Sequence, residues 1–326
     1  MNVLSLFDGM SCGRIALERA GIKVDSYYAS EIDKHAMTVA KANWPENINL
    51  GDVQHINYQM LPQIDLVIGG SPCQGFSFAG KQLNFSDPRS ALFFEFVHAV
   101  RELKPKYFML ENVKMKKEHL QVITEQLGVE PILINSSLVS AQNRQRYYWT
   151  NIPGVTQPED KGIVLADIIQ ESVSDEFFYS EKSIAYMERG NEKWQQAGDR
   201  RADRYLQTPE KEKAFTLTAN FHKGVPYNYF LDSHISVKQL GRGNNKGFEK
   251  PMLKSPSMTS NAWEHNVKVK SVEDSGFRKL TPIECERLQT VPDNYTNHVS
   301  NTQRYKMLGN GWTVDVIAHI FKNMDA

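Results

Sequence analysis

The feature that most constrains the fold is the alternation of two hydrophobic patterns through the first 150 residues. Short, almost uninterrupted apolar runs take turns with segments whose apolar residues recur at helical spacing. Apolar runs between helices are typical of a parallel sheet that is covered on both faces, so the sequence predicts a mostly parallel α/β fold. The predicted strands are Val3–Phe7, Val24–Ser30, Ile64–Gly69, Lys106–Leu110 and Ile132–Leu138, and the predicted helices are Gly13–Ala20, Lys34–Asn43, Ala91–Leu103 and Lys117–Leu127.

The sequence changes character after about residue 153, where Pro, Gly, Asn and Lys become more frequent and helical periodicity weakens. Helical patterns return at Thr281–Thr290 and Thr313–Asn323. We therefore expect a first domain over residues 1–164, a smaller, irregular β-rich domain over 165–275, and a C-terminal segment over 276–326 that returns to the first domain.

Charge is balanced overall and uneven along the chain. The 38 Lys and Arg offset the 38 Asp and Glu, which argues against a generally basic nucleic-acid binder. Between Arg200 and Lys270, thirteen basic residues stand against six acidic ones, which is typical of a phosphate-binding face or, alternatively, of a solvated surface. Three cysteines are too few for a disulfide framework, which favours the cytoplasm, and no apolar run is long enough to span a membrane.

The first predicted strand runs into a glycine-containing loop, FDGMSCG. Gly9 and Gly13 allow backbone to approach a ligand, and the following helix begins with free N–H groups. The loop lacks the G-x-G-x-x-G fingerprint, so a pyrophosphate ligand is not favoured. Glu31 ends the second strand, where a carboxylate can accept from ribose hydroxyls, and Asp52 lies where a third strand would end. The pattern indicates a nucleoside site without phosphate, which S-adenosylmethionine fits, with other α/β ligand sites as the alternative.

The stretch GGSPCQGFSFAG, residues 69–80, places Cys73 just beyond a buried strand. In parallel sheets, ligands bind outside the carboxyl ends of strands, so this thiol lies where chemistry is expected. No C-x-x-C pair or histidine cluster accompanies it, which disfavours a metal site. No histidine can be assigned to it as the partner that a cysteine peptidase requires. A purely structural cysteine is the other alternative, although such residues usually lie inside an element.

Two more stretches bring polar side chains to the same predicted edge. KYFMLENV puts Glu111 directly after a buried strand, close to where Cys73 would lie; the alternative is a capping or surface glutamate. SAQNRQRYYW puts Arg144 and Arg146 two residues apart, so on a strand they share one face and suit a planar polar ligand. The alternative is one functional arginine beside one structural arginine.

Together these stretches resemble the DNA (cytosine-C5) methyltransferases. FDGMSCG is similar to the family's cofactor loop, SEID to its ribose carboxylate, GDV to its adenine contact, SPCQGFS to its nucleophile, ENV to its glutamate and QNRQR to its paired arginines. RKLTPIECERLQ and QRYKMLGNGW resemble the two closing motifs, and the resemblance covers about residues 1–153 and 277–326. It is of the bacterial or phage type. Gly311 and Trp312 stand where bacterial members commonly have a serine and an aliphatic residue, and Trp312 is similar to the animal de novo methyltransferases.

The resemblance implies a Rossmann-like, S-adenosylmethionine-dependent methyltransferase fold, with target recognition in residues 165–275 and catalysis in the rest. It implies that Cys73 adds to cytosine C6 and that Glu111 contacts N3 and the exocyclic amine. Arg146 would hold the base O2 with Arg144 in support, although which arginine does which stays open. The implied cofactor is S-adenosylmethionine, and no metal is expected. The implied cofactor-binding residues are Phe7, Asp8, Gly9, Met10, Gly13, Glu31, Ile32, Asp52, Val53, Pro72, Leu92, Asn310 and Trp312, with a core role as the alternative for Ile32 and Leu92.

A duplex hides the reacting carbons, so the target cytosine must be flipped out of the helix. We expect the loop Phe76–Gln82 to close over DNA and the stretch Lys238–Lys250 to enter the major groove, unless the latter is a polar linker. Ordinary surface charge is the alternative for Lys81 and Arg89. The expected DNA contacts are Ser77, Ala79, Lys81, Gln82, Arg89, Lys223, Arg242, Asn244 and Lys246.

The expected partner is double-stranded DNA, with a cognate restriction endonuclease as a further candidate, and the chain is expected to be a monomer without membrane attachment. A tRNA cytosine-C5 methyltransferase uses the same chemistry and stays an alternative. A catalytically inactive DNA-binding regulator is another, although Cys73, Glu111 and Arg146 argue against it. An N6-adenine or N4-cytosine enzyme would have a Pro-Pro-aromatic loop in place of SPCQ. We interpret Cys12 and Cys285 as incidental.

Overall fold

The computed structural model describes residues 1–71, 88–180, 182, 206–207, 213–214, 216–223, 229–231, 235–239, 248–252, 267–269 and 277–325. A seven-stranded sheet in the order β3-β2-β1-β4-β5-β7-β6 forms its centre. The strands from β3 to β5 run parallel, and β7 pairs antiparallel with both β5 and β6. The bounds are β1 Asn2–Leu6, β2 Ser26–Ser30, β3 Ile48–Asn49, β4 Leu66–Gly69, β5 Tyr107–Val113, β6 Ile132–Asn135 and β7 Gln145–Thr150.

Alternate residues of the central strands enter two separate hydrophobic cores. Leu4 and Val67 belong to one core, while their neighbours Val3 and Ile68 belong to the other. Side chains on a strand point alternately to the two faces, so both faces of the sheet are buried. The mostly parallel, doubly covered sheet expected from the sequence is thereby confirmed.

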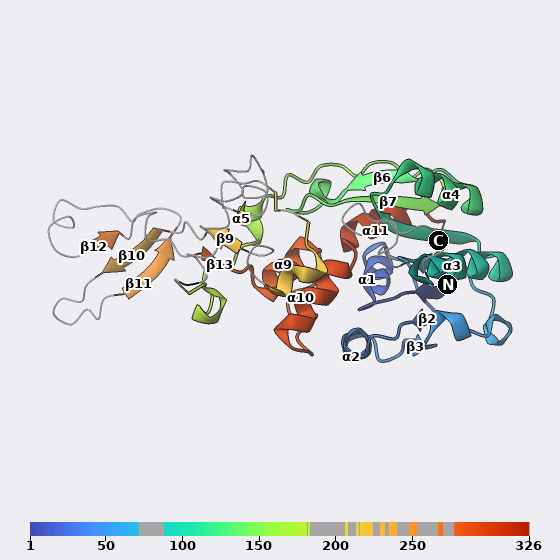
Figure 1. The fold of residues 1–326 in the computed structure, drawn as a ribbon, viewed down its shortest axis with the longest axis horizontal. Coiled ribbons are helices and arrows are strands. Elements are labelled where there is room, and N and C mark those ends of the chain that lie inside the picture. Colours follow the sequence, from blue (N-terminus) through green and yellow to red (C-terminus); the bar gives the residue numbers. More distant parts are fainter. Residues whose placement is uncertain are drawn as a thin grey trace.

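Helices supply the other half of each core. On one face, α1 and α11 pack together; on the other, α3 and α4 contribute Phe93, Phe96 and Ile123. Figure 1 shows this part of the molecule with its helices around the central strands. The bounds are α1 Cys12–Arg19, α2 Lys34–Asn43, α3 Pro88–Leu103, α4 Lys117–Leu127, α5 Leu165–Ile168, α9 Pro282–Leu288, α10 Asn301–Asn310 and α11 Val314–Phe321.

Three differences between the predicted and the observed elements bear on the site. β5 continues to Val113, so Glu111 lies inside the strand rather than after it, because β7 extends the pairing through Glu111↔Tyr148. The predicted strand Ile132–Leu138 ends at Asn135, whose side chain accepts from Ser137 N and starts a 3-10 turn. Helix α10 was not predicted from the sequence; its Gly309 packs directly against the backbone of Thr218, so tertiary contact outweighs its weak helical pattern.

The region after α5 contains two small three-stranded sheets, β11-β10-β12 and β13-β9-β8. In Figure 1, β10, β11 and β12 lie at the opposite end of the molecule from the seven-stranded sheet, with α9 and α10 between them. Five of these six strands lie within residues 165–275, where the smaller β-rich domain is expected, and β13 lies just beyond; the domain boundaries stay a prediction. Their bounds are β8 Leu206–Gln207, β9 Tyr229–Leu231, β10 Ile235–Gln239, β11 Phe248–Met252, β12 Val267–Val269 and β13 Phe277–Arg278.

One stretch of the expected recognition region is hydrogen-bonded to the domain that contains the seven-stranded sheet. Lys213 Nζ donates to the Ser137 and Ser140 carbonyls at 2.8 and 3.3 Å, and Ala214 N donates to Ala141 O at 2.6 Å. The following 3-10 helix, Ala219–Lys223, packs on α10. Residues 213–214 and 216–223 thus pack against the domain that contains the seven-stranded sheet.

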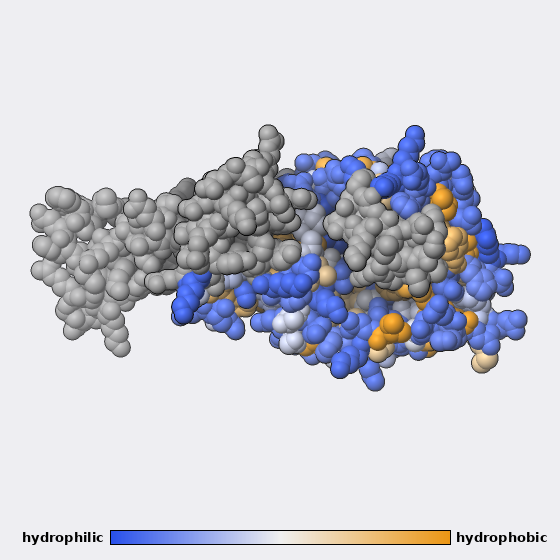
Figure 2. Space-filling model, in the orientation of Figure 1, coloured by the Kyte–Doolittle hydropathy of each residue, from blue (hydrophilic) through white to orange (hydrophobic). Residues whose placement is uncertain are grey.

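Figure 2 shows that the described surface on this side is mostly hydrophilic, with small hydrophobic areas scattered over it. Among the described residues, no helix combines the length and apolar character that a membrane crossing requires.

Candidate active site

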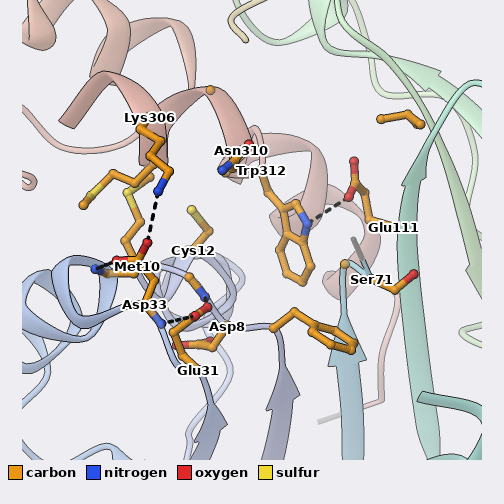
Figure 3. A pocket seen from close by; sticks show the side chains of 18 of the residues that line it. Asp8, Met10, Cys12, Glu31, Asp33, Ser71, Glu111, Lys306, Asn310 and Trp312 are labelled. Carbon is orange, nitrogen blue, oxygen red and sulfur yellow. Dashed lines mark hydrogen bonds and ion pairs between the residues drawn. The ribbon is translucent and has the colours of Figure 1, made fainter. Parts of the chain in front are cut away.

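A cavity of about 360 Å³ opens at the edge where the parallel strands end. The ends of β1, β4 and β5 meet at this edge, and β7 begins there because it runs in the opposite direction. In open α/β sheets, this edge is where ligands bind. Figure 3 shows side chains from both ends of the chain converging on the cavity. Its lining includes ten predicted site residues: Phe7, Asp8, Gly9, Met10, Glu31, Glu111, Arg144, Arg146, Asn310 and Trp312.

The loop after β1 is held in a tight turn against the second strand. Phe7, Gly9 and Ser11 all have left-handed backbone conformations, with φ of 57°, 61° and 63°. Asp8 N donates to Ser30 O at 3.1 Å, and the Asp8 carboxylate accepts from Ser11 Oγ and Tyr27 OH at 2.5 and 2.7 Å. Left-handed conformations cost energy at non-glycine residues, so this hydrogen-bonded network is what keeps the loop in place.

Burial raises the pKa of Asp8 to about 6, although hydrogen bonds from Ser11 and Tyr27 act in the opposite direction. Glu31 lies nearby and adds to the increase through charge repulsion. Asp8 is therefore a structural acid whose charge state changes in the mildly acidic range.

Glu31 is positioned to receive a polar ligand beside the loop. Its Oε2 accepts from Gly9 N, and its Oε1 accepts from Ile32 N and Asp33 N, all at 2.8 Å. The neighbouring Ile32 side chain is 69% exposed, which argues against a core role for it. An anionic acceptor between a glycine-containing turn and an exposed apolar side chain fits a nucleoside without phosphate, and so fits S-adenosylmethionine.

Helix α10 and the turn after it form the opposite wall. Gln303, Lys306, Met307 and Asn310 line the cavity from this helix. Lys306 Nζ lies 3.5 Å from Asp33 Oδ2, so the two walls are joined by a half-exposed ion pair. Figure 3 shows this contact crossing the cavity between α10 and the start of α2.

Glu111 occupies the far end of the cavity and is held through both of its oxygens. Arg146 Nε lies 3.0 Å from Glu111 Oε1, and Trp312 Nε1 donates to Glu111 Oε2 at 3.1 Å. The adjacent Asn112 Nδ2 donates to Ser71 Oγ at 3.2 Å, which ties the end of β5 to the end of β4. The carboxylate is thus oriented by two N–H donors at the same edge as Ser71, which precedes Cys73 by two residues in the sequence.

The two arginines of QNRQR share the cavity, as their spacing predicted, and they differ in their partners. Arg144 is buried and donates to three backbone carbonyls, those of Leu217 at 2.8 Å, Gly309 at 3.2 Å and Gly311 at 2.8 Å. Arg146 instead pairs with Glu111 and donates to Gln145 O at 2.8 Å. Arg144 therefore fastens chain segments together, while Arg146 faces the polar end of the cavity.

Five predicted cofactor residues do not line this cavity. Gly13 faces the core, where an added Cβ would lie 2.4 Å from Ile68 Cδ1. Asp52 starts a 3-10 turn by accepting from Gln54 N at 3.0 Å. Val53 and Leu92 pack in the core with α3, which was the alternative given for Leu92. Ile32, the fifth, is the exposed residue described above.

Other predicted residues lie elsewhere or outside the described part. Lys223 is described and exposed at the end of its 3-10 helix, and the backbone of Arg89 lies in α3. The following predicted residues lie outside the described residues: Pro72, Cys73, Ser77, Ala79, Lys81, Gln82, Arg242, Asn244 and Lys246.

Sequence reasoning missed several residues that line the cavity. Gln303, Lys306 and Met307 recur with Asn310 at spacings of three, four and seven residues, which is one face of a helix. Treating residues 301–310 as a helix would have identified them. Asp33, Gly70 and Ser71 also line the cavity; Asp33 adjoins the predicted Ile32 and Ser71 adjoins the predicted Pro72.

The two described cysteines do not look reactive. Cys12 and Cys285 are both buried, and burial raises the pKa of the Cys12 thiol to about 12, so it stays protonated. Within the described residues, no group of three His, Cys, Asp or Glu side chains could hold a metal ion.

Comparisons with known proteins agree with this geometry. Residues 1–326 match the family described as C-5 cytosine-specific DNA methylase. The chain is 30% identical to the type II methyltransferase M1.ScrFI of Lactococcus lactis subsp. cremoris, over 99% of this chain and 77% of that protein. It is 27% identical to the orphan methyltransferase M.SPRI of Bacillus phage SPR, over 99% and 97%.

Among solved structures, the fold is similar to that of the Entamoeba histolytica methyltransferase EhMeth. The TM-score is 0.71 at 17% identity, with 99% of this chain and 97% of that chain covered. The match over the whole chain, together with the relatives of bacterial and phage origin, confirms the resemblance drawn from the sequence. The chain belongs to the C-5 cytosine-specific DNA methylase family.

Proposed function

We propose that the cavity at the sheet edge is where this chain methylates cytosine, with Cys73 as nucleophile and with Glu111 and Arg146 as the groups that bind the base. As a member of its family, the chain is a DNA (cytosine-5) methyltransferase that uses S-adenosylmethionine. The observation that carries the assignment of residues is the single cavity, which places Glu31 and the Phe7–Cys12 loop at one end and Glu111 at the other. A methyl donor and a base could meet between them.

The nucleophile solves a chemical difficulty. Cytosine C5 is a poor nucleophile, and a thiolate that adds to C6 converts the ring into an enamine whose C5 carbon can attack an electrophile. Cys73 follows Ser71, which lines the cavity, by two residues. After methylation, loss of the C5 proton and expulsion of the Cys73 thiolate restore the aromatic ring.

Glu111 and Arg146 supply the polar recognition of the base. Charge builds at cytosine N3 as the thiolate adds, so a carboxylic acid placed there can share a proton with it. Arg146 pairs with Glu111 and lies at the same end of the cavity, where its guanidinium can donate to the base O2. Arg144 acts indirectly, because its guanidinium is occupied by backbone carbonyls.

S-adenosylmethionine supplies the methyl group when bound. We assign its ribose to Glu31, its adenine to Phe7 and the exposed Ile32, and its methionine end to the backbone around Gly9 and Asn310. Asp52 follows β3, the strand that pairs with β2, and is proposed to reach the adenine amine. The acidic and apolar character of these residues supports a cofactor that carries no phosphate.

The function is tested with duplex DNA that contains 5-fluorocytosine. Fluorine at C5 blocks the final elimination, so incubation with S-adenosylmethionine should trap the enzyme covalently on DNA. A denaturant-stable complex is expected for the wild type, and none for Cys73→Ser. A Cys73→Ser variant that forms the complex as well as the wild type would show that another residue is the nucleophile.

The names of the relatives support a proposal about the biological setting. We propose a role in protecting host or phage DNA, alone or beside a restriction endonuclease that cuts the same site. Bisulfite sequencing of methylated plasmid should reveal one short sequence, and Arg242→Ala should relax one of its positions if that arginine reads a guanine. We further propose a cytoplasmic monomer, for which light scattering should give about the chain mass of 37.2 kDa.

A further inference from the structure

The contact between Trp312 and Glu111 joins the two halves of the cavity. Trp312 is 9% exposed and Glu111 is 8% exposed, so the hydrogen bond between them is shielded from solvent. The same indole lines the cavity between the Phe7–Cys12 loop and the base-binding end. Figure 3 shows the indole between the two groups of side chains, with its N–H directed at the carboxylate.

Gly70 makes the space that the indole N–H occupies, while Gly13 lies at ordinary van der Waals distance from the far edge of the ring. A Cβ added to Gly70 would lie 2.8 Å from Trp312 Nε1 and 3.2 Å from Glu111 Oε2. A Cβ added to Gly13 would lie 3.5 Å from Trp312 Cζ3. The backbone at Gly70 therefore approaches the hydrogen bond closely, and even a methyl group there would disturb it.

The backbone that carries the indole is also fixed. Gly311 O accepts from Arg144 Nη2 at 2.8 Å and from Gln289 Nε2 at 3.2 Å. On the other side of Trp312, Thr313 Oγ1 donates to Gln289 Oε1 at 3.0 Å. The indole is thus held by contacts on both sides of its own residue, which leaves its N–H little freedom to turn away from Glu111.

We infer that Trp312 is a positioning residue for the methyl-transfer step: its indole N–H holds one Glu111 oxygen while Arg146 holds the other, so that the carboxylate faces the base in a single orientation. This inference rests on the proposed role of Glu111. A carboxylate with only one fixed oxygen can rotate about its last bond, and a rotated carboxylate misses the base. Packing of the indole ring alone cannot fix the orientation of the Glu111 carboxylate, because that orientation depends on the indole N–H as a hydrogen-bond donor.

The sharpest test replaces the Trp312 indole with benzothiophene, which keeps the shape of the ring and removes only the N–H. Loss of one hydrogen bond to a charged group should slow single-turnover methyl transfer about tenfold, while the Kd for S-adenosylmethionine changes by less than about threefold. Trp312→Phe should slow the step at least as much. Trp149→Phe is the matched control. It also removes an indole N–H hydrogen bond, the one of 3.0 Å to Thr124 Oγ1, and Trp149 does not line the cavity.

A second measurement needs neither DNA nor cofactor. The chain has five tryptophans, and Trp312→Phe identifies the indole ¹⁵N–¹H signal of that residue. Glu111→Gln should move this signal upfield, because the acceptor loses its charge, and should leave the Trp149 signal in place. A wild type that fails to methylate DNA would count against the proposed function. The response of the Trp312 indole signal to Glu111→Gln would still show whether the hydrogen bond between the two residues exists.

Three results would overturn the inference. One is an unchanged methyl-transfer rate with benzothiophene at position 312. Another is a loss of S-adenosylmethionine affinity as large as the loss of rate, which would mean that the indole only packs against the cofactor and does not orient Glu111. The third is a Trp312 signal that does not respond to Glu111→Gln.

Discussion

The two arginines of the QNRQR stretch should fail in different ways when each is changed to lysine. The Arg144 guanidinium donates hydrogen bonds to the backbone carbonyls of Leu217, Gly309 and Gly311. Lysine keeps the charge and loses the planar guanidinium, so it can bond one of these carbonyls, and two of the three charged hydrogen bonds are lost. Hydrogen bonds to charged groups contribute about 1.5–3 kcal/mol each, so Arg144→Lys should cost about 3–6 kcal/mol of unfolding free energy.

Arg146→Lys should behave in the opposite way. Its main partner is one carboxylate oxygen of Glu111, 3.0 Å from Nε, and an ammonium group can still pair with that carboxylate. The stability loss should stay below about 1.5 kcal/mol, whereas single-turnover methyl transfer should fall at least about tenfold because the planar donor to the base is gone.

Urea unfolding followed by circular dichroism, together with thermal melts, separates the two variants. For a domain of this size, about 3 kcal/mol corresponds to a Tm lower by on the order of 6 °C. Arg144→Lys should show that Tm shift and Arg146→Lys should not. In the single-turnover assay, Arg146→Lys should show the larger loss of methyl-transfer rate. Equal Tm shifts for the two, or a larger shift for Arg146→Lys, would refute the division of roles.

The remaining predictions concern the cofactor loop and helix α10. Burial raises the pKa of Asp8 to about 6 from the reference 3.8, so between these values the folded state holds a proton that the unfolded state releases. The free energy of unfolding should therefore fall by up to about 3 kcal/mol as the pH rises from 4 to 6. Asp8→Asn should remove this slope in urea titrations; a slope that persists would contradict the assignment. Gly309→Ala should destabilise by about 3 kcal/mol or more in a thermal melt, since its Cβ would lie 2.2 Å from the Thr218 backbone, and a tolerated substitution would show that the two segments separate readily. Glu31→Gln should weaken S-adenosylmethionine binding at least about tenfold by calorimetry with little change in Tm, and unchanged affinity would move the ribose elsewhere.

Much of the catalytic domain could be predicted because its sheet is buried on both faces. Val3, Ile68 and Met109 lie in near-continuous apolar runs, and such runs are typical of strands that are buried on both faces of a parallel sheet. α2 and α4 begin and end at the predicted residues because apolar spacing and local capping agree; Asp33 accepts from His35 N and Ala36 N, and Gly128 ends α4 in a left-handed conformation. Here local preference and tertiary packing point to the same structure.

Helix α10 and the role of Arg144 could not be predicted, for a related reason. α10 carries Gly309 and Asn310 and few apolar residues, so its helical state depends on the segment around Thr218, about 90 residues earlier in the sequence. Arg144 looked like a ligand-binding arginine because its carbonyl partners are backbone groups that no side-chain pattern reveals. Contacts between distant backbones leave almost no trace in the residue types.

The cavity draws its opposite walls from distant parts of the chain, and this sets when the site can exist during protein synthesis. Phe7 to Met10 form one wall, and Gln303 to Trp312 form the other. At a translation rate of about 5–20 residues per second, the second wall is made roughly 15–60 s after the first. A nascent chain on the ribosome therefore lacks a complete cofactor site for most of its synthesis. Methylation should begin only once the final helices are released to fold, so that an interrupted translation product stays catalytically silent.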